Sequence, residues 1–269
     1  ISSVKRYCGK AKLIFDTVDL QFLREQRRAE VENDEMVLRQ ANRMKRTEFQ
    51  LARGTNITFV VTPVDKEIML KEDPSLNVEI LSNIDEVRPP ERTFSERSDM
   101  MFLGGFSHLP NVDAVKWFVE EIFPVIKREI PDAKFYVVGV DPPPEIQSLG
   151  SDDVIVTGYV KDLVPYFEKC RVFVSPLRYG AGVKGKINRS MSHGVPVVTT
   201  SIGAEGMELV DGEDTLIADE PAEFAEKVVT IYKNEELWGK LSRNSLKNVQ
   251  EYYSYETARE QLKEIIGRL

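Results

Sequence analysis

The segment 178–187, RYGAGVKGKI, combines three glycines with two lysines. Glycines at positions 180, 182 and 185 permit a sharp turn whose backbone amides can approach a ligand closely. Lys184 and Lys186 bring two full positive charges to the same turn. A helix that begins here would add free amides and a partial positive charge. The segment therefore predicts a site for a phosphate-bearing ligand; the alternative is a glycine-rich turn that only connects two elements.

The charge around this segment supports an anion site. The chain has a net charge of −8, and the whole deficit lies in residues 99–269, because residues 1–98 carry equal numbers of basic and acidic side chains. Such a balance argues against general binding to nucleic acid. Within the acidic half, residues 169–204 contain no Asp or Glu but carry six basic side chains: Lys169, Arg171, Arg178, Lys184, Lys186 and Arg189. This basic island favours a compact anion as ligand.

Two known phosphate-binding patterns match the segment literally. Gly180, Gly182 and Gly185 spell G-x-G-x-x-G, and Glu205 follows twenty residues later, as in a dinucleotide site. That site normally follows the first strand of its unit, whereas this loop follows the fourth. The same residues also spell G-x-x-x-x-G-K, but Ile187 stands where a nucleotide-hydrolysing loop needs Ser or Thr to hold Mg²⁺. Ile187 and the lack of an Asp-x-Asp pair near a strand end predict a site without a metal.

The elements that position this loop predict an α/β fold. Six apolar, β-branched runs alternate with helical patterns in the second part of the chain, which predicts a doubly wound parallel sheet of the Rossmann type. Ligands of such sheets bind beyond the carboxyl ends of the strands. The first part has three strand candidates and one long polar helix over 21–52, and a polar, proline-containing segment, 88–98, separates the parts. The expected strands are 12–18, 56–62, 77–83, 100–106, 134–140, 154–160, 171–177, 196–200 and 215–219.

Length and composition predict a globular protein of two domains, 1–98 and 99–269. The 269 residues are 42% hydrophobic and 30% charged, and no run approaches the ~18 apolar residues of a membrane span. The two cysteines, Cys8 and Cys170, cannot form a disulfide framework, which favours a reducing compartment such as the cytoplasm. Residues before Lys12 read as the tail of a helix, so we expect the chain to be part of a longer protein.

The order of motifs resembles the group 1 glycosyltransferases, which are retaining enzymes of the GT-B fold. FLGGFSHLPNVDAVKWF at 102–118, VTGYVKDL at 156–163, SPLRYGAGVKGKINRSMSHGVPVVTT at 175–200 and IGAEGMEL at 202–209 are similar to the donor-binding domain of that family. LIFDTVDLQFLRE at 13–25 resembles the last part of its acceptor domain, and LSNIDEV at 81–87 its hinge. The resemblance covers nearly the whole chain but begins partway into the first domain.

The resemblance implies roles for individual residues. Gly104 and Gly105 would present amides to the donor diphosphate, whose charge Lys184 and Lys186 would neutralise as the nucleotide leaves. Remaining donor-binding residues implied are Arg178 and Gly182 at the diphosphate, Tyr159 and Val160 at the nucleobase, and Glu205 and Gly206 at sugar or phosphate oxygens. Asp19 and Arg24 resemble cleft-facing residues of the acceptor domain, Asp19 as a catalytic residue, and His108 could face the same cleft or cap a helix.

The chain also departs from the family pattern. Two glutamates usually stand eight residues apart in this region, but Ala181 and Arg189 occupy those positions, and Val18 replaces a histidine usual beside Asp19. We expect a metal-independent glycosyltransferase, of hexosyltransferase type and without a cofactor, that uses a nucleotide-diphosphate sugar and a glycan, lipid-linked or protein acceptor, with at most peripheral membrane association. The alternatives are a catalytically silent nucleotide-binding module and an NAD-dependent oxidoreductase. With only three strands in its first domain, this chain alone is expected to transfer sugar poorly.

Overall fold

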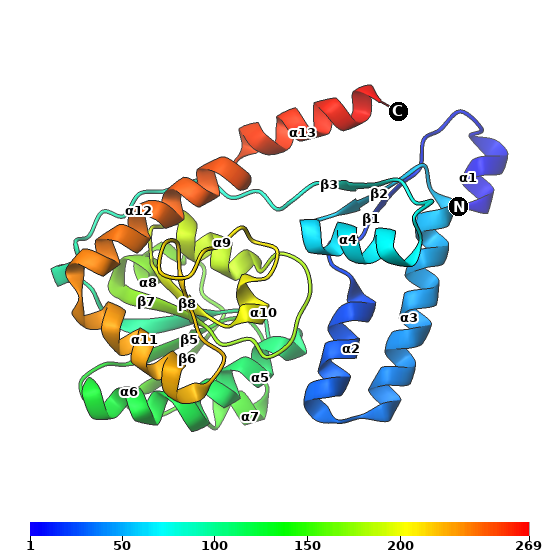
Figure 1. The fold of residues 1–269 in the computed structure, drawn as a ribbon. Helices are drawn as coiled ribbons and strands as arrows, with labels where there is room; N and C mark the ends of the chain where they lie inside the picture. Colours follow the sequence, from blue (N-terminus) through cyan, green and yellow to red (C-terminus); the bar gives the residue numbers. More distant parts are fainter. Residues whose placement is uncertain (269) are drawn as a thin grey trace.

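The runs predicted as strands form strands in the computed structural model, which describes residues 1–268 (Figure 1). The three strands of the first lobe make a small parallel sheet in the order β1-β2-β3. Its elements are α1 (Ser2–Tyr7), β1 (Ile14–Asp16), α2 (Gln21–Glu32), α3 (Glu35–Gly54), β2 (Ile57–Val60), α4 (Pro63–Glu72) and β3 (Val78–Ile80).

The prediction of one long helix over 21–52 is wrong, because the chain turns between α2 and α3. Asn33 adopts the left-handed conformation, with φ of 52°, and so ends α2. The next residue, Asp34, caps α3 by accepting a hydrogen bond from the amide of Met36 at 2.7 Å. The polar character of the whole stretch masked a turn that an Asn-Asp pair readily forms.

The second lobe is a six-stranded parallel sheet in the order β6-β5-β4-β7-β8-β9. The strand order reverses between β4 and β7, which is the ligand-binding switch point of doubly wound sheets. Alternate residues of β4 face different layers: Met100 and Phe102 belong to one buried cluster, Met101 to another. The strands are β4 (Ser98–Leu103), β5 (Phe135–Val138), β6 (Val154–Gly158), β7 (Cys170–Ser175), β8 (Val197–Thr199) and β9 (Leu216–Ile217).

Helices cover both faces of this sheet and confirm its predicted fold class. A 3-10 turn, Phe94–Glu96, precedes β4, and a π-helical stretch, Phe118–Ile122, continues α5 into α6. The helices are α5 (Leu109–Trp117), α6 (Phe123–Glu129), α7 (Pro144–Gln147), α8 (Val164–Lys169), α9 (Gly185–Ser192), α10 (Ser201–Ala204), α11 (Pro221–Lys233), α12 (Glu235–Tyr252) and α13 (Tyr255–Gly267).

The last helix, α13, returns from the large lobe to the small sheet (Figure 1). Ile265 packs against Ile57 and Phe59, while Val60 belongs to a cluster on the other face with α3 and α4. This alternation is the period-2 pattern of a strand buried on both sides. By its contacts α13 therefore belongs with the small lobe, and the division of the chain at residues 98 and 99 stays a prediction.

Candidate active site

A cleft of about 770 Å³ lies between the two lobes, beyond the carboxyl ends of β4 and β7. It is lined by the turn after β1, the segment 81–97 that joins the lobes, the loop after β4 and the glycine–lysine loop after β7. Half of the predicted site residues line it: Asp19, Gly104, Gly105, His108, Lys184 and Lys186. The sequence thus located the floor of the cleft but not all of its borders.

The two lysines of the loop are held close to the cleft floor by polar groups of the large lobe. Lys184 is buried, and its Nζ donates to the carbonyl of Gly182 at 2.8 Å. The Nζ of Lys186 donates to Oδ1 of Asn111 and lies 4.5 Å from the centre of the Phe102 ring. Burial lowers the pKa of Lys184 to about 8 and that of Lys186 to about 7. An anion in the cleft would restore their charged forms.

Asn111 links Lys186 to the glycine turn after β4, a role that the sequence did not indicate. Its Nδ2 donates to the carbonyl of Gly105 at 2.7 Å, while its Oδ1 accepts from Lys186. A side chain on Gly104 would place its Cβ 2.6 Å from Nδ2 of Asn111. The equivalent atom on Gly105 would meet nothing closer than 3.6 Å. Gly104 is therefore required sterically, whereas Gly105 is not.

Asp19 and His108 line the cleft near the small lobe, whereas Arg24 lines an adjoining cavity. Arg24 donates to the Asp19 carboxylate, and this pair opposes the effect of burial, which raises the pKa of Asp19. Desolvation, with repulsion from Arg24 and Lys186, lowers the pKa of His108 to about 4. The imidazole of His108 is thus neutral at physiological pH and can both donate and accept a hydrogen bond.

Glu205, Gly182 and Gly206 lie outside the cleft lining, where they contact the small lobe. Arg27 of α2 donates two hydrogen bonds to the Glu205 carboxylate, 2.6 and 2.7 Å long, and one to the carbonyl of Gly180 at 2.7 Å. A Cβ on Gly206 would lie 2.7 Å from Thr62, and one on Gly182 would lie 3.1 Å from Asp19. These predicted donor-binding residues meet the small lobe in this structure.

Three other predicted residues lie outside the cleft lining. Tyr159 is 75% exposed, and Val160 packs beside the cluster that contains Phe167 and Ile187. Arg178 pairs with Asp113, its Nε 2.9 Å from Oδ2, and faces a separate cavity of about 360 Å³. In the segment that contains Tyr159 and Val160, Leu163 is the residue that lines the cleft.

Arg189 and Asp85 form an ion pair in the wall of the cleft. Nε of Arg189 lies 2.7 Å from Oδ1 of Asp85, whose side chain is only 7% exposed. Burial raises the pKa of Asp85, and Arg189 opposes that effect. The sequence singled out Arg189 but missed Asp85, because the two residues are far apart in the chain.

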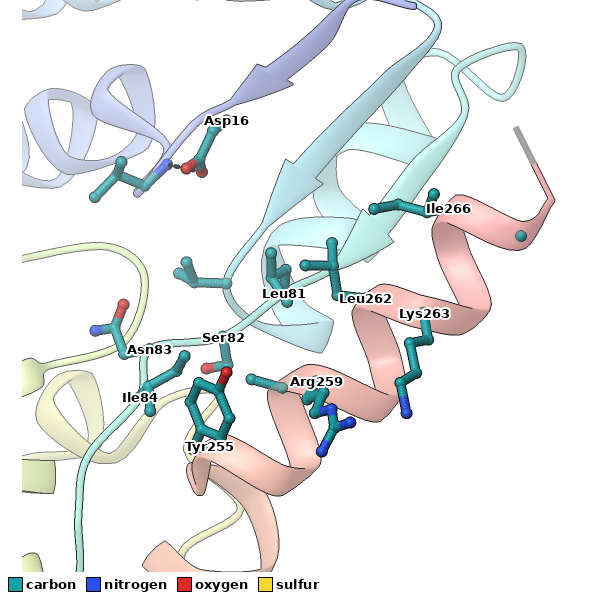
Figure 2. A pocket seen from close by; sticks show the side chains of 14 residues that line it. Asp16, Leu81, Ser82, Asn83, Ile84, Tyr255, Arg259, Leu262, Lys263 and Ile266 are labelled. Carbon is teal, nitrogen blue, oxygen red and sulfur yellow. Dashed lines mark hydrogen bonds between the residues drawn. The ribbon is translucent and has the colours of Figure 1, made fainter.

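A second cavity, of about 700 Å³, lies between α13 and the segment that joins the lobes (Figure 2). Leu262 and Ile266 point from α13 toward the small sheet, whereas Lys263 points away from it (Figure 2). Within residues 1–268, every helix falls short of the length or apolar character that crossing a bilayer requires. The same residues contain no group of three His, Cys, Asp or Glu side chains arranged to hold a metal ion.

Comparisons of the sequence place the large lobe in a known family. The family described as glycosyl transferases group 1 matches residues 97–234. An uncharacterized 44.6 kDa protein in the cps region of Klebsiella pneumoniae is 26% identical over 164 residues, which are 58% of this chain and 42% of that protein. The chain thus spans less than half of this curated relative.

Solved structures of glycosyltransferases share the fold of both lobes. HepE of Anabaena, in complex with UDP and glucose, superposes with a TM-score of 0.74 at 12% identity, covering all of this chain and 74% of that one. A mutant of TarM of S. aureus, in complex with fondaparinux, alpha-GlcNAc-glycerol and UDP, has a TM-score of 0.72 at 18% identity, covering 82% and 46%. Sucrose-phosphate synthase of Thermosynechococcus elongatus has a TM-score of 0.75 at 14% identity, covering 98% and 69%.

Proposed function

The chain belongs to the group 1 glycosyltransferases, and on that basis we propose that it transfers a sugar from a nucleoside-diphosphate sugar to a glycan, lipid-linked or protein acceptor. We further propose retention of configuration, a hexose as the transferred sugar and a role in polysaccharide biosynthesis. The relative in a cps region supports that role. UDP in the structures of HepE and TarM supports a nucleoside diphosphate as the bound part of the donor.

The observation that carries this proposal is that Lys184, Lys186 and the Gly104–Gly105 turn line the same cleft, with Asn111 joining Lys186 to the turn. When the bond from sugar to phosphate breaks, negative charge builds up on the leaving diphosphate. Preorganised cations and amides stabilise such charge most effectively in a site that excludes water. Because two lysines supply the positive charge, the proposed transfer needs no divalent metal.

The remaining predicted residues receive roles according to their place around the cleft. The sugar would face Asp19 and the neutral imidazole of His108, which border the cleft near the small lobe. The nucleobase would contact the backbone of residues 159–160 at the edge of the cleft that Leu163 lines. Glu205 could bind the donor only after Arg27 releases its carboxylate. Arg178 would act at a distance, since Asp113 holds it outside the cleft.

The test is the binding of UDP and GDP to the double variant Lys184→Ala/Lys186→Ala, measured by calorimetry. Each charge-assisted hydrogen bond contributes roughly 1.5–3 kcal/mol, so affinity should fall at least about tenfold. Lys134→Ala is the matched control, because Lys134 is exposed beside the amino end of β5. Unchanged affinity in a folded double variant, or binding that EDTA abolishes and Mg²⁺ restores, would contradict the proposal.

A catalytically silent nucleotide-binding module is the second candidate. The observation that favours it concerns Arg189, which stands where the family usually has a glutamate and forms an ion pair with Asp85. Release of UDP or GDP from any member of a panel of nucleotide sugars, measured with mixed glycan acceptors, would exclude the silent module.

A further inference from the structure

The ion pair between Asp85 and Arg189 lies in the cleft lining, where Asp85 is buried and Arg189 is 47% exposed. Both residues line the cleft, and their closest atoms are 2.7 Å apart. Asp85 belongs to the segment that joins the lobes, and its amide donates to the carbonyl of Tyr253 at 2.9 Å. The backbone of the joining segment is therefore fixed where its carboxylate meets α9.

The position of Arg189 relates this pair to the phosphate-binding lysines. Arg189 follows Lys186 by three residues on α9, so the two side chains lie on the same face, about one turn apart. One turn of helix advances about 5.4 Å, which is comparable to the length of a pentose ring with its substituents. Whatever is attached to a phosphate at Lys186 can thus extend directly to Arg189 and Asp85.

The surroundings of the pair indicate which end of the donor it faces. Leu163 and Val160 pack beside the cluster that contains Ile187 and Met191 of α9, and Val87 of the joining segment packs there too. The proposed nucleobase edge and the joining segment therefore pack against the same cluster as α9. Asp19 and His108 border the cleft on the side of the small lobe, where the proposed transfer places the sugar.

We propose that Asp85 binds the ribose hydroxyls of the nucleotide, with Arg189 as the residue that positions its carboxylate. The inference rests on the proposed function, because it requires a nucleoside diphosphate as the bound part of the donor. A carboxylate accepts hydrogen bonds from vicinal hydroxyls, and a guanidinium held beside it keeps it ionised and oriented. In this chain the joining segment thereby supplies a carboxylate to the cleft, while α9 carries Arg189 at the position where the family usually has a glutamate.

The experiment compares UDP, GDP and ADP with their 2′-deoxy counterparts in calorimetric titrations of the whole chain. For whichever base binds, the wild type should bind the deoxynucleotide about tenfold more weakly. Asp85→Asn keeps the size of the side chain but removes its charge. We expect this variant to lose more affinity for the ribonucleotide than for the deoxynucleotide, which offers the carboxylate only its 3′-hydroxyl, so that the discrimination shrinks.

Two further variants separate ribose recognition from a structural role. Arg189→Gln should reduce the discrimination in part and leave diphosphate binding measurable, even if Asp85→Asn fails to fold. Asp153→Asn is the matched control, because Asp153 pairs with Lys127 at 2.9 Å beside the amino end of β6, and it should keep the full discrimination.

The outcomes that overturn the inference differ from those that overturn the proposed function. Equal affinity of the wild type for ribo- and deoxynucleotide would overturn the inference and leave the nucleotide site intact. An equal loss for both nucleotides in Asp85→Asn would show that the pair only supports the cleft. If no nucleoside diphosphate bound to the wild type, the proposed function itself would fail, and the inference with it.

Discussion

The two walls of the cleft are supported in different ways. On the large lobe, Lys186 is held by Asn111, which also binds the glycine turn, so every partner belongs to the same lobe. The small lobe instead reaches across the cleft, where Arg27 binds Glu205 and the carbonyl of Gly180. The comparison indicates that the wall with the two lysines, the proposed phosphate site, is preorganised within one lobe, whereas the opposite wall depends on the contact between the lobes.

The largest expected effect comes from crowding the preorganised wall. In Gly104→Val the new side chain would collide with Asn111 and displace it from Lys186, since a Cβ alone already lies 2.6 Å away. Asn111 would then no longer hold Lys186 and the glycine turn in place. A hydrogen bond to a charged group contributes about 1.5–3 kcal/mol, so affinity for UDP or GDP should fall about 10- to 100-fold. Gly105→Ala is the control and should change affinity less than about threefold, because its Cβ meets only an ordinary contact. Calorimetry measures both, and equal effects of the two substitutions would contradict preorganisation by Asn111.

The next effect is a pH dependence of diphosphate binding. Burial holds the pKa of Lys184 at about 8 and of Lys186 at about 7, so both lysines lose their charge as the pH rises. A bound diphosphate favours the charged form and raises these pKa values, so binding takes up protons. Affinity should therefore be highest below about pH 7 and fall about tenfold or more between pH 7 and 9.

Calorimetry in two buffers of different ionisation enthalpy measures this proton uptake directly. Lys184→Met/Lys186→Met should remove both the uptake and the slope, while Lys134→Ala should keep them. A wild-type affinity that stays constant over the same pH range would show that the lysines are already fully charged without ligand.

Sequence patterns identified the preorganised wall better than the opposite one, for a physical reason. Residues close in sequence build the loop with Lys184 and Lys186, and their chemistry can be recognised without knowing the fold. The contact of Arg27 with Glu205 joins residues 178 positions apart, and that of Asp85 with Arg189 depends on how the joining segment meets α9. Such pairs become visible only when tertiary packing is known.

The strands could likewise be predicted, because buried parallel strands appear as short, continuous apolar runs. The break between α2 and α3 was missed, since its Asn33–Asp34 turn interrupts a stretch that is polar throughout. The side chain of Tyr159, in contrast, is mainly solvent-exposed, which no periodicity in that short segment reveals.

A smaller effect is expected from breaking the contact between the lobes. Arg27→Ala removes both hydrogen bonds to Glu205 and the one to Gly180. Because both side chains are partly exposed, we expect about 1 kcal/mol, which corresponds to roughly fivefold faster hydrogen exchange in the segments around Gly180 and Glu205. Exchange followed by mass spectrometry measures this, with Arg39→Ala, on an exposed pair of α3, as control.

The smallest effect should come from Asp19→Asn, which removes a charge from the small-lobe wall while Lys186, Asn111 and the glycine turn keep their mutual contacts. Asp19 lies near enough to Lys184 for their charges to interact, and it also pairs with Arg24. Removing its negative charge makes the cleft slightly more positive, so a diphosphate should bind about twofold more tightly, within the range of a screened charge interaction. Sugar transfer, in contrast, should decrease if Asp19 acts at the reacting centre, as proposed. A large loss of UDP or GDP affinity in a folded Asp19→Asn protein would mean that the small lobe takes part in phosphate binding, and the distinction between a preorganised and a dependent wall would no longer hold.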